Sequence, residues 1–435
     1  MLDLDSFPAP SNMIKDDLMN NCISDKNTDI WLPRSYTSSG NKSNIDDDCP
    51  YTREQLTALI ALQNIDELGP VSLSLLLAKA GSIDALINGA IDPMEVVGLR
   101  PGCRQELQRF LRNPRRVKQW QLAEQSLDWL VKTGSHILVY DDPRFPPLLK
   151  ELSDCPQLIY LAGNINTFKS MSISIVGARK SSAGAQQFTE HLAAELSESG
   201  LLITSGMASG IDAAAHRGSL NVGGKTVAVW AAGLDLVYPR EHQSLAERIL
   251  ENGCVITEMP LGTAAKPIYF PRRNRLVSGI SLGVVVVQAA LPSGSLITAN
   301  YAAEQNREVF AVPGSIHNPL SAGCHQLIKD GATLIESAED VLTVIKELQL
   351  AQGLTAAESD KDKEHNEIAL KEAEAALIAG LSVEMRLVLD AIGYDPAPYE
   401  LIESRIDAGI DNLSAVLVDL ELQGIVTVVG GLYSR

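Results

Sequence analysis

The sequence predicts an α/β protein with a doubly wound parallel sheet, preceded by a small helical module and followed by a winged-helix-like module. The middle of the chain alternates short apolar runs with helical stretches, which is typical of strands buried on both faces. Apolar residues at helical spacing come before it, and amphipathic helices with a terminal hairpin come after it. A chain of 435 residues has room for two to four such domains.

Composition predicts a cytoplasmic protein without a membrane span. The longest apolar run, near Leu282 to Leu291, is about half the length of a bilayer span, and Gly283 and Gln288 interrupt it. The N-terminus lacks the basic start and apolar core of a signal peptide. Six scattered cysteines form no CxxC pair, so we expect a reducing compartment and no metal site.

The N-terminal part is predicted as three segments. Residues 1–50 are rich in Asn, Asp and Ser and have little to bury, so we expect a mostly disordered lead-in. Residues 51–130 form a small helical module of the SAM or helix-hairpin-helix kind, in which Thr52 to Gln55 is a capping box and Gly69-Pro70 a turn. Its role toward DNA is left open. Residues 131–170 are an extension that packs on the core.

Residues 171–347 are the predicted core, with about six or seven parallel strands. Six of them are visible as short apolar runs, at 174–176, 201–204, 226–230, 254–257, 284–287 and 309–312. A charged linker, 348–375, leads to the winged-helix-like module at 376–435. That module is acidic, so a protein contact or a structural role is at least as well supported as DNA binding.

Charge is distributed unevenly along the chain. The formal net charge is -18, but residues 171–340 hold 12 Lys and Arg against 15 Asp and Glu, a net of -3. Within that region Phe270 to Arg275 has three arginines in four positions. A local basic cluster in an acidic protein suits a single anion-binding place.

The loops that follow the strands carry chemistry for a phosphate. In a parallel sheet the carboxyl ends of the strands share one edge, so these loops converge there. Gly206, Gly210 and Gly294 allow backbone N–H groups to approach an anion, and nearby serines and arginines add donors and charge. In any one loop, glycines that merely close a tight turn are the commoner explanation, but three such loops beside basic residues favour an anion site.

Other ligands and a catalytic site are poorly supported. Gly177-Ala178-Arg179 lacks the spacing of a dinucleotide fingerprint, and Lys225 precedes a strand rather than following one, so it is no Walker lysine. Asp212 is interpreted as a helix cap and His216 as a packed or hydrogen-bonded histidine. Glu258 is expected to hold Arg179 or Arg275 in place. We predict no catalytic residues, no metal and no cofactor.

The motifs together resemble the DNA-processing protein A (DprA, or Smf) family. The resemblance covers about 137–342 and rests on Val176–Arg179, Ser205–His216, Gly233–Asp235 with Tyr238-Pro239, Phe270–Arg275, Ser293–Ala299 and Val309–Gly314. The first fifty residues have no counterpart in the family pattern, and His242 stands where asparagine is more usual. Neither departure is expected to touch the groove.

The resemblance implies a Rossmann-like domain that binds single-stranded DNA without sequence specificity, forms a homodimer and loads RecA recombinase in natural transformation. Arg179 matches a basic motif position, Lys225 a DNA-contacting lysine, and Lys266 to Arg275 an aromatic-basic loop in which Phe270 or Tyr269 stacks on a base. The DNA- or phosphate-binding residues expected are Gly177, Arg179, Lys180, Ser205, Gly206, Met207, Ser209, Gly210, Lys225, Lys266, Phe270, Arg272, Arg273, Asn274, Arg275, Ser293, Gly294 and Ser295.

Two alternatives remain at this point. The first is a nucleotide-processing enzyme resembling the phosphoribohydrolases of the lysine-decarboxylase-like type; Pro292 to Thr298 corresponds to their motif but lacks its catalytic glutamate. The second is a pure adaptor whose acidic ends bind proteins. Release of a free base from a nucleoside monophosphate would favour the enzyme.

Overall fold

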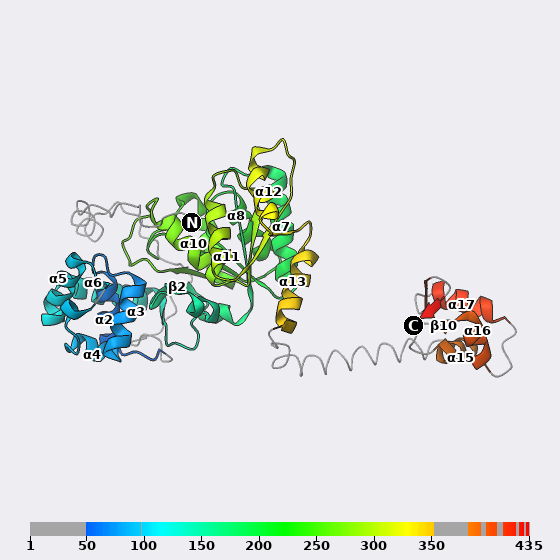
Figure 1. Ribbon diagram of the computed structural model, residues 1–435, viewed down its shortest axis with the longest axis horizontal. Helices are drawn as coiled ribbons and strands as arrows, with labels where there is room; N and C mark the ends of the chain where they lie inside the picture. Colours follow the sequence, from blue (N-terminus) through cyan, green and yellow to red (C-terminus); the bar gives the residue numbers. More distant parts are fainter. Residues whose placement is uncertain are drawn as a thin grey trace. The chain divides into compact units, whose positions relative to one another are not determined.

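The computed structural model describes residues 49–96, 98–351, 382–392, 397–406, 412–422, 426–429 and 432–434 (Figure 1). The predicted lead-in, apart from its last two residues, and most of the predicted linker lie outside these ranges. The chain divides into two compact units, Met1–Ile345 and Lys346–Arg435. No described helix is long and apolar enough to cross a bilayer.

The helical module begins at the predicted capping box. Thr52 Oγ1 accepts from the Gln55 N–H at 3.3 Å, and Gln55 Oε1 accepts from the Thr52 N–H at 2.7 Å. Its interior is apolar, and Leu56, Leu76 and Leu107 are fully buried. Its helices are α2 (Arg53–Gln63), α3 (Pro70–Ala80), α4 (Ile83–Ile87), η3 (Pro93–Glu95), α5 (Pro101–Arg112), η4 (Pro114–Arg116) and α6 (Lys118–Thr133).

The core is a nine-stranded sheet in the order β1-β2-β6-β5-β4-β3-β7-β8-β9. Strands β3 to β9 run parallel, which confirms the predicted sheet, while β1 and β2 extend it as an antiparallel hairpin beside β6. The strands are β1 (His136–Val139), β2 (Leu158–Gly163), β3 (Ser172–Gly177), β4 (Leu202–Ser205), β5 (Thr226–Val229), β6 (Cys254–Thr257), β7 (Gly283–Val287), β8 (Glu308–Ala311) and β9 (Thr333–Leu334).

Helices cover both faces of the sheet because its winding reverses at β3. Connections β3 to β6 step one way across the sheet and β7 to β9 step the other way, so right-handed crossovers place their helices on opposite faces (Figure 1). The first set is α7 (Ala183–Glu198), α8 (Ile211–Asn221) and α9 (Gln243–Asn252), and the second is α10 (Tyr269–Gly279), α11 (Gly294–Glu304) and α12 (Ala322–Lys329), with α13 (Ala338–Ala351) after β9.

The second unit is a small helical domain with a three-stranded sheet of order β10-β12-β11. Its core includes Val388, Ile402, Leu417 and Leu420. This arrangement agrees with the predicted winged-helix-like module. Its elements are α15 (Val383–Ile392), β10 (Ala397–Pro398), α16 (Tyr399–Arg405), α17 (Leu413–Leu422), β11 (Thr427–Val429) and β12 (Leu432–Ser434).

Candidate nucleic-acid interface

The loops after β3, β4, β5 and β7 meet at the carboxyl edge of the sheet, where the winding reverses. Gly177, the last residue of β3, pairs with Val287, the last residue of β7. The Ala178 N–H then donates to the carbonyl of Gln288 at 2.8 Å. Arg179 therefore leaves the sheet at the switch point, which is the usual ligand crevice of this topology.

The segment from Phe270 to Arg275 is the start of helix α10, not the loop that the sequence predicted. A helix places residues three apart on the same side. Phe270 and Arg273 therefore share one side, and Arg272 and Arg275 share another. The three arginines are therefore divided between two sides of the helix.

Arg273 is a buried arginine that connects strand ends to helix α10, a structural role for which we use the word brace. The residue is 4% exposed, and its Nη1 donates to the carbonyl oxygens of Gly206 and Val229. These carbonyls follow or end β4 and β5, so one side chain joins two strand ends to α10. Burial lowers the pKa of Arg273 to about 10, and the nearby Asp212 carboxylate acts in the opposite direction. We assign Arg273 to the frame of the site rather than to its surface.

Arg275 is the second brace, and Glu258 holds it as predicted. Its Nη2 donates to a Glu258 oxygen, and its Nε lies 3.2 Å from a carboxylate oxygen of Asp154. Arg275 and Glu258 are 4% and 2% exposed at their side chains. Arg272 is the exposed member of the network, with its Nε 3.0 Å from the other Glu258 oxygen.

The surface of the site is an aromatic pair with an arginine on it. The guanidinium of Arg179 lies 5.2 Å from the centre of the Phe270 ring, and Arg273 lies 6.0 Å from it. Tyr238 lies against the same ring, with the two ring centres 5.6 Å apart. Of the three aromatic residues Tyr238, Tyr269 and Phe270, Tyr238 is the most open to solvent, since it is 49% exposed and the other two are only partly exposed. The sequence had favoured Phe270 or Tyr269 for stacking.

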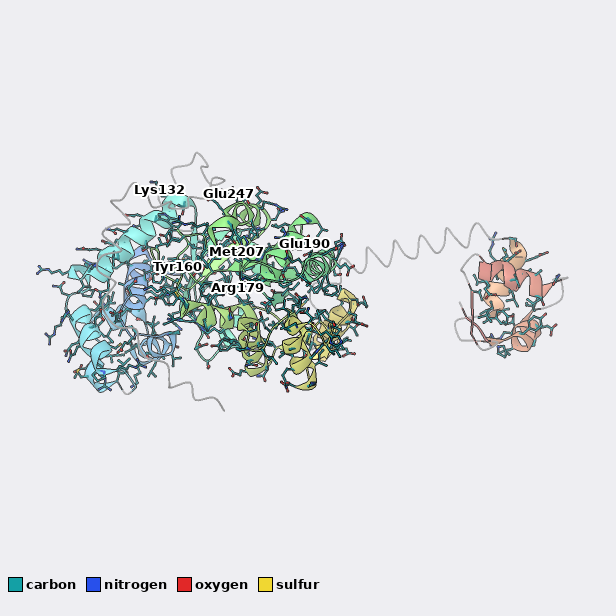
Figure 2. The ribbon with its side chains drawn as sticks, turned by 90° about the horizontal axis from the view of Figure 1, so that it is seen from above. Lys132, Tyr160, Arg179, Glu190, Met207 and Glu247 are labelled. Carbon is teal, nitrogen blue, oxygen red and sulfur yellow. The ribbon has the colours of Figure 1, made fainter. Side chains whose placement is uncertain are left out.

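Exposed cations lie on loops at the same edge of the sheet. Arg179, Lys180 and Lys266 are exposed, and none of them forms an ion pair with another described residue. We name these three residues, together with Arg240, the edge cations. Figure 2 marks Arg179 and Met207, which come from the loops after β3 and β4. An acidic chain thus keeps positive charge at the edge where its loops converge.

Arg240, like Tyr238, is a residue of this site that sequence reasoning missed. It lies in η7 (Arg240–His242), exposed, after β5 and therefore at the same edge. Two contacts fix η7 to the loop after β4: Ser209 Oγ donates to Glu241 Oε1 at 3.0 Å, and His242 Nδ1 donates to the Met207 carbonyl at 2.9 Å. His242 therefore touches the predicted groove, contrary to expectation. The position of Arg240 directly after Tyr238-Pro239 was the available signal for it.

The glycines of the loops mostly serve contacts within the protein. A Cβ on Gly206 would lie 2.4 Å from Arg273 Nη1, and one on Gly210, at φ +81°, would lie 2.4 Å from the Ala178 carbonyl. A Cβ on Gly177 would meet the Val287 carbonyl at 2.2 Å. Gly294 has nothing within 4 Å of this position. Of these four glycines, Gly294 alone has the open space that a close approach to an anion needs.

The polar residues of the loops are also largely engaged. Ser205 is buried and donates to the Ile175 carbonyl at 2.6 Å, and Met207 is buried with φ +63°. Ser293 caps α11 by accepting from the Ser295 N–H at 3.2 Å, and Asn274 Nδ2 donates to the Gly294 carbonyl at 3.2 Å. These groups position the loops, and Ser295 is itself only 9% exposed.

Lys225 was predicted for the wrong edge of the sheet. It is exposed and directly precedes β5, so it lies at the amino edge, opposite the edge cations. In a parallel strand these two edges are a full strand length apart. The family correspondence suggested for Lys225 does not agree with this topology.

Asp212 and His216 are buried on α8: His216 is packed and hydrogen-bonded as expected, whereas Asp212 bonds the preceding loop and α8 has no side-chain cap. Asp212 accepts from the Ala208 N–H at 3.3 Å, and burial raises the pKa of its carboxyl. His216 Nδ1 lies 2.7 Å from Thr226 Oγ1, whose own hydrogen is donated to the Ile203 carbonyl. The imidazole is therefore the donor, which requires a proton on Nδ1. Burial lowers the pKa of His216 to about 3, with His242, Arg273 and Arg217 adding to the effect.

This burial predicts a pH-dependent stability. A histidine with a pKa of about 3 when folded and 6.5 otherwise stabilises the fold fully above pH 6.5 and loses that contribution as the pH falls toward 3. Between pH 7 and pH 5 we expect a loss of about 2 kcal/mol in the free energy of unfolding. A His216→Asn variant keeps a donor for Thr226 and should lose that much less over the same range.

Urea unfolding followed by tryptophan fluorescence provides the measurement, since Trp31, Trp120, Trp129 and Trp230 all precede residue 346. An equal loss between pH 7 and pH 5 in wild type and variant would show that His216 is not the responsible group.

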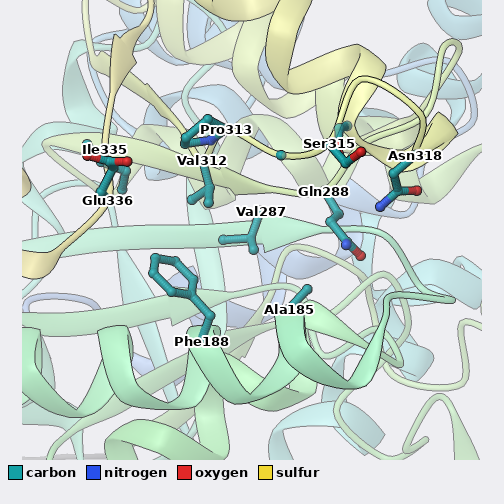
Figure 3. A pocket seen from close by; sticks show the side chains of 12 residues that line it. Ala185, Phe188, Val287, Gln288, Val312, Pro313, Ser315, Asn318, Ile335 and Glu336 are labelled. Atoms are coloured by element: carbon teal, nitrogen blue, oxygen red, sulfur yellow. The ribbon is translucent and has the colours of Figure 1, made fainter.

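A cavity of about 360 Å³ lies beside the Arg179 loop (Figure 3). Phe188 points from α7 toward Val287 and Val312, while Gln288 and Asn318 lie at the other end. The Ser182 N–H donates to Gln288 Oε1 at 3.0 Å, which joins the cavity wall to the loop. Within the described ranges, no three His, Cys, Asp or Glu side chains are placed to hold a metal.

Comparison with known proteins agrees with this geometry. The sequence model described as DNA recombination-mediator protein A matches residues 136–346, and the one described as the DprA winged helix domain matches residues 372–431. Protein Smf of Escherichia coli is 35% identical over 364 residues, which are 82% of this chain and 89% of that protein. The chain belongs to the DNA recombination-mediator protein A family.

Two further relatives support membership of the DNA recombination-mediator protein A family. DNA processing protein DprA of Streptococcus pneumoniae is 42% identical over 201 residues, 46% of this chain and 71% of that protein. The X-ray structure of DNA processing protein A from the same organism has a TM-score of 0.57 and 31% identity, and it covers 66% of this chain and 97% of that one. Family membership confirms the resemblance drawn from the loop motifs.

Proposed function

We propose that this protein binds single-stranded DNA without sequence specificity at the carboxyl edge of its sheet. The observation that carries the proposal is Arg179 on the Tyr238–Phe270 pair, with the other edge cations on loops at the same edge of the sheet. Exposed cations hold a phosphate backbone, and an open aromatic ring stacks on any base. Neither contact reads a base edge, so sequence tolerance follows. Arg179 and Tyr238 are the residues we place in direct contact with the strand.

The finer role comes from the family. A recombination mediator acts on a strand before a recombinase does, so we propose that the bound strand is protected and then transferred to RecA recombinase. We also propose that the protein acts as a homodimer through its Rossmann-like domain, in the cytoplasm and without catalysis. Binding tests with and without RecA, and the molar mass in solution, address these points separately.

Arg179→Ala is expected to lower the affinity for oligo-dT about 10- to 100-fold, because a charge-assisted hydrogen bond contributes roughly 1.5–3 kcal/mol. The slope of log K against log salt concentration should shrink by about 0.7 for one lost phosphate contact. Fluorescence anisotropy at several salt concentrations measures both quantities. Arg179→Lys should retain most of the slope.

The matched control is Arg248→Ala, which removes an exposed arginine of α9 that bonds Asn221. We call the edge cations together with the Tyr238–Phe270 pair the edge site. An equal loss in both variants would mean that net charge, not the edge site, governs binding. Absence of any binding at low salt would overturn the proposal, and release of a free base from a nucleoside monophosphate would favour the enzyme instead.

A further inference from the structure

The segment from Arg100 to Lys118 is the most basic part of the chain. It holds seven Lys and Arg residues and one acidic residue, Glu106, while the rest of the chain has 29 basic and 53 acidic residues. It comprises α5, η4 and the first residue of α6, on the outer side of the helical module in Figure 1. In the sequence, this basic segment is far from the loops that form the edge site. The proposed function does not use it.

The arginines of this segment divide into two groups. Arg100 pairs with Glu67 at 3.5 Å, Arg104 donates to the Val96 carbonyl at 3.0 Å, and Arg115 pairs with Glu54. The other three arginines, Arg109, Arg112 and Arg116, are exposed and bond to no described residue through their side chains. We name these three the α5 patch.

The fold places the α5 patch on one side. Cys103, Leu107 and Phe110 are buried, and they anchor one face of α5 in the module. Arg109 and Arg112 are three residues apart on the exposed side, and Arg116 follows one turn later in η4. The Arg116 N–H donates to the Asn113 carbonyl at 3.1 Å, which fixes η4 directly after the helix.

The helix dipole explains the position of only some of these arginines. Arginines in the last turn of a helix favour its negative end, which suits Arg109 and Arg112. It does not account for Arg116, which lies beyond the helix. Like charges at this spacing also repel, which destabilises the helical module. An anionic ligand would reduce this repulsion. The patch consists of arginines only, whose planar forks fit phosphate oxygens in pairs.

We propose that the α5 patch is a second nucleic-acid site that binds the phosphodiester backbone through Arg109, Arg112 and Arg116. Its ligand is either a further stretch of the strand held at the sheet edge or a separate duplex. Both present the same chemistry, a regular line of phosphates. The first of these ligands rests on the proposed function, whereas a separate duplex does not, because the α5 patch shares no residue with the edge cations.

The test compares the full-length protein with the variant R109Q/R112Q/R116Q on three labelled probes: a six-nucleotide dT strand, a forty-nucleotide dT strand and a thirty-base-pair duplex. We expect the variant to lose at least fivefold in affinity for the long strand or for the duplex, and to keep its affinity for the short strand. Loss of three phosphate contacts should shrink the salt slope by about 2 for the strand or about 2.7 for the duplex. Which probe is affected identifies the source of the backbone.

The matched control is K132Q/R248Q/K329Q, which removes the same charge from three exposed positions elsewhere. Equal losses in both triple variants, or no loss on any probe, would overturn the proposal. Arg179→Ala gives the complementary result, weaker binding of the short strand, so failure of the edge site and failure of the α5 patch are distinguishable. Single variants, each expected to give about a third of the change in slope, replace the triple variant if its tryptophan melting curve shifts.

Discussion

Replacement of Glu258 by alanine is expected to lower the free energy of unfolding of the first unit by about 3–5 kcal/mol, the usual cost of leaving a buried charge without its partner. Glu258 is 2% exposed and binds both Arg275 and Arg272. Without it, Arg275 stays buried and keeps only Asp154, whose side chain is 41% exposed. Urea unfolding followed by tryptophan fluorescence measures the change.

Two further variants show whether the buried Glu258–Arg275 pair is responsible for the loss of stability. Arg272→Ala removes the partner that is 46% exposed and should cost less than about 1 kcal/mol. Glu258→Gln keeps the shape and one acceptor, so its cost should fall between these values. If Glu258→Ala proves as mild as Arg272→Ala, the network is not what holds α10 to the sheet.

Gly206→Ala is the second variant with a large expected effect. The new Cβ would lie 2.4 Å from Arg273 Nη1 and 2.7 Å from its Cζ, so the guanidinium must leave its place. Its bonds to Gly206 and Val229 would then be lost, and buried Asp212 would keep Arg179 but lose Arg273 as a nearby cation. We expect the free energy of unfolding to fall by about 3–5 kcal/mol. We also expect weaker binding of oligo-dT, because Arg273 packs against the ring of Phe270.

Gly294→Ala is the matched control for a glycine that faces open space. With nothing within 4 Å of its Cβ and a place at the start of α11, it should change stability by less than about 0.5 kcal/mol. If the strand approaches this backbone closely, the same variant should still weaken DNA binding. A stable Gly206→Ala protein with wild-type binding would contradict the role of Arg273 as a brace.

The edge site shows where sequence reasoning was sufficient. The apolar runs and their order predicted a parallel sheet, and the topology of such a sheet requires the loops after its strands to share an edge. Arg179 could therefore be placed at that edge from the sequence. Glu258 was also expected to pair with Arg179 or Arg275, because it follows a strand at the same edge, and the structure shows the pair with Arg275.

Distinguishing braces from surface residues needed the tertiary structure. Phe270 to Arg275 reads as one basic cluster, but a helix distributes it over two sides, and burial then makes Arg273 and Arg275 part of the frame. The role of Gly206 also became clear only in the structure. Its lack of a Cβ makes room for the Arg273 side chain rather than for a phosphate. Residue type does not reveal which neighbour will fill a space.

The sequence by itself determined the class of fold, the edge at which the loops meet and the family. Hydrophobic periodicity and the order of motifs can be read directly from the sequence. The tertiary structure alone decided which side chains are exposed at this edge: it buried Arg273 and Arg275, placed Lys225 at the opposite edge, and brought in Arg240 and Tyr238. The physical reason is that burial and pairing are contacts between distant segments, and a local pattern carries no record of them.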